Sequence, residues 1–338
     1  MTRNTVILRL LCFSIIWTPC SCGKPERQVV LYTSVDSFIA EPIVRDFEKA
    51  SGIRVVMLGD TEASKTTGLV NRLIAEKASP RCDVFWNSEL VRTVILKDQG
   101  VLEPYVSPSA AEIPSEFKDK GGFWHGFAAR ARVIIYNRNL LRDREIPQSL
   151  ADFADPRWRG RLCMASPMFG TTTAHMAAVI NAMGPEPASE LFRRMKENEV
   201  ALVPGNSVVK ELVARGEFAA GLTDTDDAWE AIQSGRPVAM LYPDQAGLGT
   251  LVIPNSVALV KGARHPAEAK ELIDYLLSKA VEKRLAFSPS RNMPVREGVE
   301  HPAEVKSIAE IQRMPCDFEQ LARKHESSSE ILKDAFGL

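Results

Sequence analysis

The chain has 338 residues, with 42 Lys and Arg, 43 Asp and Glu, and an apolar fraction of 45%. This length allows two domains, and the apolar fraction is that of an ordinary globular protein. The net charge of −1 lacks the basic excess typical of proteins that bind DNA or RNA, so we expect no nucleic acid partner.

The N-terminal segment predicts export from the cytoplasm. An apolar run over residues 6–17 follows a basic start and is followed by small residues and cysteines. This order is that of a secretory signal, and the run is too short to span a bilayer. Ser21-Cys22 resembles a bacterial lipobox. We therefore expect a signal peptide over 1–21, lipidation of Cys22, a linker over 22–28, and a membrane-anchored protein in the periplasm or at the cell surface. Plain secretion and an uncleaved anchor stay open.

Strands and helices alternate through the next part of the chain. The pattern predicts strands at 28–33, 53–58 and 82–86, with helices over about 37–51, 67–78 and 88–97. The first helix places Ile39, Ile43 and Phe47 on one face and ends at Gly52, a residue suited to the left-handed conformation after a helix. This alternation predicts an α/β fold with a mostly parallel, doubly wound sheet.

A second run of the same kind follows. It predicts strands at 130–137, 162–165, 219–223 and 257–260, and helices ending at Gly184 and spanning 208–215, 229–233 and, as one long helix, 266–284. No flexible Gly/Ser linker separates the two runs, so we expect the chain to cross between two lobes through strands. The expected N-lobe is 29–128 with 259–338, and the expected C-lobe is 129–258.

Sequence signals for catalysis are weak. The motifs of serine hydrolases, P-loop NTPases, zinc proteases and dithiol redox proteins are missing, and the five histidines lack metal-ligand spacing. We expect no enzymatic activity and no catalytic cofactor. Cys82, Cys163 and Cys316 are widely spaced, which favours buried free thiols, with one disulfide left open.

Polar residues follow several of the predicted strands. In open α/β sheets ligands bind at the carboxyl ends of the strands, and helix N-termini there favour anions. Ordinary helix capping is the alternative explanation for any single loop. The candidate ligand-binding residues are Ser34, Asp36, Asp60, Asn87, Glu89, Arg130, Ser166, Thr171, Thr172, Asn206, Asp224, Thr225 and Asp226.

Charged side chains are concentrated in two places. Asp224, Asp226 and Asp227 lie between a strand and a helix, where they either bind a hard cation or a ligand, or cap and face solvent. Arg130 and Arg132 lie on one face of their strand, where they can pair with an anion or with carboxylates of the protein.

Several segments together resemble one family. They are LYTS at 31–34, LIAE at 73–76, DVFW at 83–86, GVLEP at 100–104, RARVIIYN at 130–137, DPRWRG at 155–160 and PNSVALVKG at 254–262. In this order the chain resembles the periplasmic ferric-iron-binding proteins of ABC importers, from about residue 29 to 293. The resemblance implies a two-lobed, type II Venus-flytrap fold that closes on its ligand, a monomer, and an ABC permease with its ATPase as partners.

The resemblance also implies a ligand. It suggests ferric iron or a ferric chelate, bound with a synergistic anion, and the oxygen ligands here would come from Asp36, Glu89, Asp224 and Asp226. Members that bind the naked ion carry two adjacent tyrosines where this chain has Thr223-Asp-Thr-Asp-Asp-Ala-Trp229. Relatives with altered ligands bind phosphorylated sugars or phosphonates. The sequence thus leaves iron first, an anionic solute second, and an extracytoplasmic enzyme or a sensor on the same fold as further alternatives.

Overall fold

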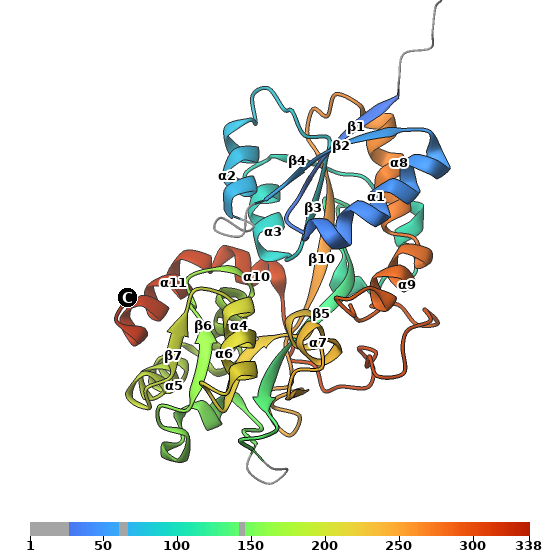
Figure 1. Cartoon of the computed structure of the whole chain (residues 1–338). Coiled ribbons are helices and arrows are strands. Elements are labelled where there is room, and N and C mark those ends of the chain that lie inside the picture. The colour runs from blue at the N-terminus through green and yellow to red at the C-terminus, as the bar shows by residue number, and fades with distance from the viewer. Residues whose placement is uncertain (1–26, 61–66, 142–145) are drawn as a thin grey trace, which may run out of the picture.

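The computed structural model describes residues 27–60, 67–141 and 146–338. They form two α/β lobes that lie one above the other in Figure 1, with β5 and β10 running between them. The predicted signal peptide, the lipidation site at Cys22 and most of the predicted linker lie outside the described residues.

The first lobe is built from the N-terminal part of the chain. Its elements are β1 (Gln28–Thr33), α1 (Ser37–Ser51), β2 (Arg54–Gly59), α2 (Thr67–Ala75), β3 (Val84–Asn87), α3 (Val91–Asp98) and β4 (Leu102–Glu103), with short 3-10 helices at Pro108–Ala110 and Ser115–Phe117. β1 lies between β2 and β3 and is parallel to both. Gly52 ends α1 with φ +67°, the left-handed conformation that the sequence predicts there.

The second lobe repeats the strand–helix order. Short 3-10 helices at Leu150–Ala154 and Pro156–Trp158 precede β6 (Leu162–Ala165), α4 (Gly170–Met183), α5 (Pro185–Glu197), β7 (Ala201–Val203), α6 (Asn206–Arg215), β8 (Ala220–Asp224), α7 (Thr225–Gln233) and β9 (Val238–Leu241). β6 is parallel to both β7 and β8. Thr171, Thr172 and Thr173 lie in the first turn of α4.

Two strands connect the lobes. β5 (His125–Asn137) pairs with β10 (Val252–Val260) through residues 125–131 and with β8 through residues 132–136. One continuous strand therefore belongs to the sheets of both lobes. Ala128 has φ +44°, and the register of β10 shifts between Pro254 and Asn255 beside it. The irregularity bends the strands at the crossing between the lobes.

Apolar side chains form a layer on each side of the sheets. Along β1, Leu31 belongs to one buried cluster and Tyr32 to the other, because successive side chains of a strand point to opposite faces. Helices α1, α6, α7, α8 and α9 contribute to the first layer, and α2, α3, α4, α5, α10 and α11 to the second. Helices thus cover both faces of the sheets, as the doubly wound prediction requires.

The C-terminal segment departs from two expectations. The helix predicted over 266–284 is two helices, α8 (Pro266–Leu276) and α9 (Lys279–Phe287), because the Ser278 hydroxyl caps α9 by accepting the Val281 N–H. The prediction that all of 259–338 belongs to the N-lobe is wrong for α11 (His325–Phe336), which packs on α4 and α5 of the second lobe. Its Phe336 ring stacks on Phe192 with centroids 5.7 Å apart.

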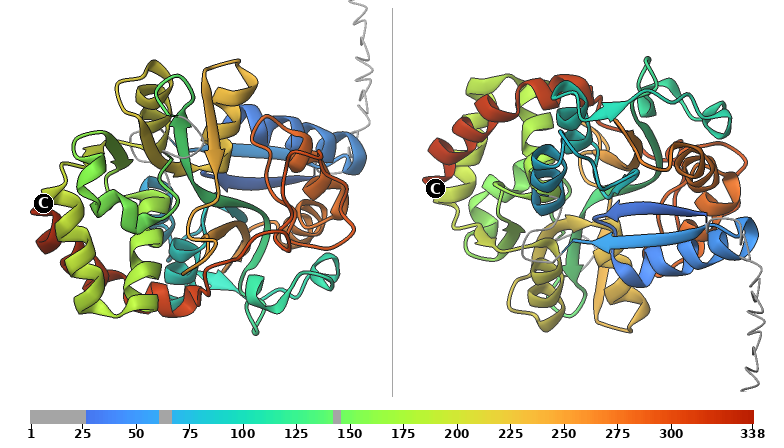
Figure 2. Two further views of the ribbon diagram at one scale, coloured as in Figure 1. Left: turned by 90° about the horizontal axis from the view of Figure 1, so that it is seen from below. Right: turned by 90° about the horizontal axis from the view of Figure 1, so that it is seen from above.

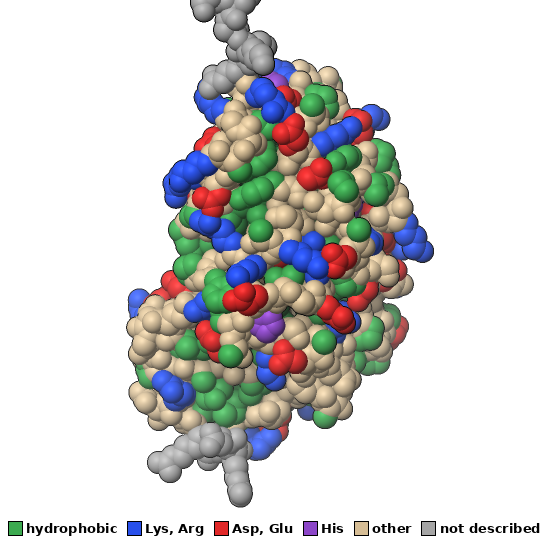
Figure 3. Space-filling model, turned by 90° about the vertical axis from the view of Figure 1, so that its right-hand side faces the viewer, with side chains coloured by type: hydrophobic (Ala, Val, Ile, Leu, Met, Phe, Trp, Pro, Cys, Tyr) green, Lys and Arg blue, Asp and Glu red, His purple; other side chains and the backbone are tan. Residues whose placement is uncertain are grey.

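Helix α10 (Phe318–Arg323) lies between the lobes, against α3 and α4. Both views in Figure 2 show the C-terminal helices, drawn in red, alongside the helices of the second lobe. Within the described ranges, every helix is too short or too polar to cross a membrane. In Figure 3, acidic and basic side chains are interspersed over the face turned toward the viewer.

Candidate functional site

A cavity of about 1090 Å³ lies where the two lobes meet. Its walls come from the start of α1 and the loop before α3 in the first lobe, and from the starts of α4, α6 and α7 in the second. Arg130 of the connecting strand β5 also lines it. The volume is that of pockets for small organic ligands.

Two helices of the second lobe point backbone N–H groups at this cavity. Gly170, Thr171 and Thr172 begin α4, residues 205–207 begin α6, and all of them line the cavity. The residues before the first turns, Phe169 and Gly205, make no side-chain cap. Helix N-termini without such caps attract anions, because their first N–H groups have no intrahelical acceptor and the helix dipole is positive there.

Arg132 lies beneath the start of α4 and is fully buried. Its Nη1 donates to Asp224 Oδ1 at 2.6 Å and to Thr171 Oγ1 at 3.1 Å, and its Nη2 donates to Thr172 Oγ1 at 3.2 Å. The register of β5 and β8 explains this pairing, since Arg132 and Asp224 are directly opposite each other. Arg132 thereby fixes the two threonines at the edge of the cavity.

The Asp224 carboxylate is the centre of this network. Besides Arg132, it accepts the Thr171 hydroxyl at 2.7 Å and the Asn206 side-chain amide at 3.0 Å, both on Oδ2. Asp224 is only 1% exposed to solvent. Asp224 therefore orients three neighbouring groups and has little remaining capacity to bind a ligand.

Arg130 connects the two lobes across the cavity. Its Nη1 donates to Asp226 Oδ2 in the second lobe and its Nη2 to the Ser88 carbonyl in the first, each at 2.9 Å. Its Nε is buried, and within the described structure it has no hydrogen-bond partner. Burial disfavours the charge on Arg130, but Asp226, Asp224 and Asp36 outweigh it and raise the pKa of the guanidinium. Arg130 is therefore a permanent positive charge at the cavity wall.

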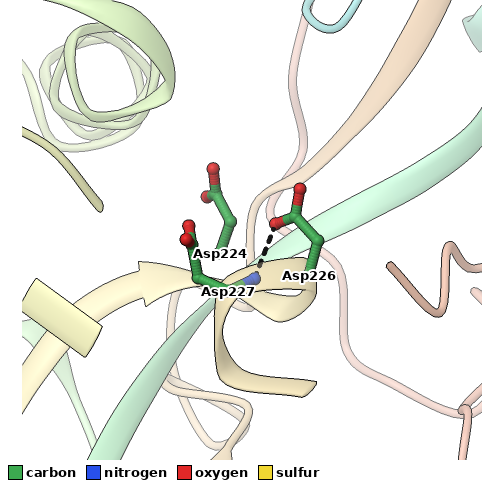
Figure 4. A group of neighbouring side chains, drawn as sticks. All are labelled: Asp224, Asp226 and Asp227. Carbon is green, nitrogen blue, oxygen red and sulfur yellow. Dashed lines mark hydrogen bonds between the residues drawn. The ribbon is translucent and has the colours of Figure 1, made fainter. Parts of the chain in front are cut away.

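The three aspartates at the β8–α7 junction form a cluster. Figure 4 shows the side chains of Asp224, Asp226 and Asp227 leaving this junction on the same side. One carboxylate oxygen from each lies within 4.8 Å of the others. The Asp227 N–H donates to Asp226 at 3.1 Å, and the Thr223 hydroxyl donates to Asp227 at 3.3 Å. Such oxygens suit a hard cation, although Arg132 and Arg130 already neutralise two of the three charges.

Glu89 lines the cavity from the first lobe and is 4% exposed. Its Oε1 accepts the Arg92 backbone N–H at 3.0 Å. Burial raises the pKa of the Glu89 carboxyl, and the nearby Arg92 side chain partly opposes the rise. Asp36, at the start of α1, lines the same side.

The structure brings most of the candidate residues together. Nine of them line the cavity: Asp36, Glu89, Arg130, Ser166, Thr171, Thr172, Asn206, Asp224 and Asp226. The four proposed metal ligands are thus among them. They come from both lobes, as expected for a ligand held between the lobes.

Four candidates lie elsewhere among the described residues. Ser34 donates to Asn87 at 2.6 Å, and both are buried beneath the loop before α3. Thr225 is fully buried and accepts the Ala131 N–H at 3.1 Å. Asp60 accepts the Leu69 N–H at 3.5 Å, at the start of α2. These side chains hold loops and the connecting strand in place behind the cavity.

Phe38, Phe169, Asp227 and Ser290 also line the cavity but are not among the candidates. Asp227 could have been included from its place in the acidic cluster. The phenylalanines carry no polar group, so nothing in a search for polar loops could single them out. Ser290 follows α9, far from the other segments in the sequence.

The three cysteines of the described chain are unpaired; Cys82 and Cys163 are buried and Cys316 is partly buried. Burial raises the pKa of Cys163 and, together with Asp317, that of Cys316, to about 12 in each case. The thiols are therefore protonated and unreactive, in line with the buried-thiol interpretation.

Two lobes joined by two strands around a cavity that both lobes line are typical of a solute-binding protein. The chain belongs to a family of bacterial extracellular solute-binding proteins, whose model matches residues 82–320. This family consists of binding proteins, which confirms that the chain is not an enzyme.

The similar proteins span nearly the whole chain. The iron uptake protein A1 of Synechocystis is 25% identical over 320 residues, covering 92% of this chain and 87% of that protein. Iron-bound HitA from Pseudomonas aeruginosa has a TM-score of 0.82 at 24% identity, covering 92% of this chain and all of the other. AfuA from Actinobacillus pleuropneumoniae, solved with fructose-6-phosphate, has a TM-score of 0.80 at 22% identity, covering 93% and 99%. These matches confirm the two-lobed periplasmic-binding-protein fold.

Proposed function

We propose that the protein is the extracytoplasmic binding component of an ABC importer and captures a small anionic solute between its lobes. The closed, loaded form would then deliver the solute to a permease with its ATPase, and Cys22 would carry a lipid anchor. Family membership and the cavity between the lobes support the importer role. Phosphorylated sugars and phosphonates are solutes of this kind; their charged group would face Arg130 and the N-termini of α4 and α6, away from the carboxylates that also line the cavity.

The observation that carries the anion assignment is Arg130 at the wall of the cavity, with a buried Nε that lacks a partner among the described residues. An oxyanion at this point would accept from the Arg130 guanidinium and from the first N–H groups of α4 and α6. Charge-assisted bonds of this kind are stronger than neutral ones, and guanidinium geometry matches phosphate.

Ferric iron, alone or as a chelate, is the second candidate. The aspartate cluster offers hard oxygen ligands, and two of the similar proteins named above are iron proteins by their names. A ferric ion on Asp226 would have to displace Arg130, and the described residues lining the cavity include no tyrosine. A ferric chelate with a polycarboxylate would suit both the aspartates and Arg130, because its iron could face the carboxylates and its anion the guanidinium.

Calorimetric titration of Arg130→Gln against wild type tests the anion assignment. The probes are fructose 6-phosphate, inorganic phosphate and ferric citrate. Losing a buried charge-assisted contact costs about 2–5 kcal/mol, so the variant should bind a phosphorylated probe at least about 30-fold more weakly. Arg157→Gln removes the same charge from a side chain 71% exposed to solvent and should bind like wild type.

The same titrations separate the two candidates. Ferric citrate binding that survives in Arg130→Gln and is lost in Asp226→Asn would favour a directly ligated iron. Equal affinities of wild type and Arg130→Gln for every probe that binds would contradict the anion assignment.

A further inference from the structure

Two phenylalanine side chains stand exposed in the cavity between the lobes. Phe38 is 58% exposed and Phe169 is 62% exposed. Eight large apolar side chains of the described chain are exposed, by 36% to 75%, and Phe38 and Phe169 are the two of these eight that line the cavity. Exposed phenyl rings are unfavourable in water, so a pair of them at a binding site calls for an explanation.

The two rings come from opposite lobes. Phe38 is the second residue of α1 in the first lobe, while Phe169 directly precedes α4 in the second. Arg130 and the first turn of α4 supply the polar part of the same cavity. The cavity therefore has a polar region for charge and an apolar contribution from each lobe.

Neither ring is needed for the core. The buried face of α1 consists of Ile39, Ala40, Ile43, Val44 and Phe47, and Phe38 lies outside it. Phe169 occupies a helix N-cap, a position where Ser, Thr, Asp or Asn normally accepts an N–H from the first turn. A residue that breaks a local rule and adds nothing to the core is typical of a functional position.

We propose that Phe38 and Phe169 hold the carbon body of the solute from opposite sides, which makes the ligand an organic phosphate or phosphonate with a ring rather than an inorganic anion or a bare metal ion. This inference rests on the proposed anion site for the charged end. A cavity of about 1090 Å³ leaves most of its space unfilled around a single phosphate, and both rings would stay in water. A ring-bearing solute covers them when the lobes close.

Three probes with similar charged heads test this inference by calorimetry: inorganic phosphate, methylphosphonate and phenylphosphonate. Wild type should bind phenylphosphonate about tenfold or more tightly than methylphosphonate, because the ring adds apolar contact. Phe38→Ala and Phe169→Ala should each remove a large part of that ratio, and the double variant should bring it close to one. Affinity for inorganic phosphate should stay unchanged.

Matched variants control for indirect effects. Phe287→Ala truncates another phenylalanine, 46% exposed and outside the residues that line the cavity, and should keep the wild-type ratio. Phe169→Tyr keeps a ring and should retain the preference. Thermal melting should be nearly the same for all single variants, since the truncated rings are exposed.

The outcomes separate this inference from the proposed function. Equal binding of the two phosphonates by wild type, or a ratio that survives in the double variant, would overturn the aromatic contact. In that case the proposed anion site would still be supported if Arg130→Gln weakens the binding of both phosphonates. A wild-type protein that binds none of the three probes would overturn both.

Discussion

Replacing Asp224 with asparagine should lower the free energy of unfolding by about 3–5 kcal/mol, because it leaves the buried Arg132 guanidinium without its carboxylate. The side chains of Arg132 and Asp224 are 0% and 2% exposed, and Nη1 lies 2.6 Å from Oδ1. Water cannot replace the lost charge at this depth. Asparagine keeps the shape of aspartate, so the change isolates charge and hydrogen bonding.

The hydrogen bonds of Asp224 place this loss in the upper part of the range. Asp224 accepts from Arg132 on one oxygen and from Thr171 and Asn206 on the other. An asparagine side chain has an NH₂ group in place of one oxygen, and either orientation sets that group against a donor. A mismatched buried pair costs more than a missing bond.

Denaturation in guanidinium chloride at pH 7 measures the effect. Asp226→Asn is the matched control: its side chain is 17% exposed and pairs with Arg130, so water can partly replace the lost charge and a smaller loss than in Asp224→Asn is expected. A loss of less than about 1 kcal/mol in Asp224→Asn would refute the reasoning, since a buried carboxylate that can be neutralised so cheaply does not hold Arg132 in place.

Three other predictions concern the lipid anchor, the closure of the lobes and the pH dependence of stability. Cys22→Ser should move the protein from the membrane fraction to the soluble fraction; an unchanged distribution, with no lipid mass on the wild-type N-terminal peptide, would rule out this anchor. Saturation with fructose 6-phosphate should reduce the radius of gyration in solution scattering, because the lobes close about β5 and β10; an unchanged radius at saturation would count against closure. Burial raises the pKa of Asp244 from 3.8 to about 6, so the folded state keeps a proton that the unfolded state has lost, and stability falls as pH rises from about 4 to about 6. Asp244→Asn should make stability nearly independent of pH between about 4 and 6, and should gain up to about 3 kcal/mol above pH 6. Melting temperatures plotted against pH measure this, and parallel plots for wild type and variant would contradict the prediction.

Local patterns predict the elements whose signals lie within a few residues. The i, i+4, i+8 spacing of Ile39, Ile43 and Phe47 and the final Gly52 define α1, which ends as expected. β6 has its predicted bounds because an apolar run of this length between turns fits a buried strand. The resemblance of several segments to one family places these elements in two lobes.

Contacts between distant residues could not be predicted in this way. The packing of α11 depends on the contact between Phe336 and Phe192. The sequence around either residue gives no sign that the two side chains are in contact. The break at Ser278 divides a continuous apolar pattern, so spacing alone suggests one helix. The packing of α11 is decided by tertiary contacts, whereas the break at Ser278 comes from a local helix cap that the apolar spacing does not reveal.

In the candidate site, too, local patterns predict part of the arrangement and contacts between distant residues decide the rest. Strand–loop–helix order placed the acidic cluster at the cavity, but the register of β5 against β8 decides that Arg132 faces Asp224. That register makes Asp224, one of the four predicted metal ligands, a support for Thr171 and Asn206. Asp226 and Arg130, nearer to solvent, remain the charged pair that a ligand can meet first.

The most direct test of an anionic solute is native mass spectrometry, with elemental analysis, of protein freshly purified from the periplasm or cell surface. The proposed function predicts an added mass of a small organic anion, released on denaturation and containing phosphorus, without stoichiometric iron. One iron per chain with no organic anion would contradict it.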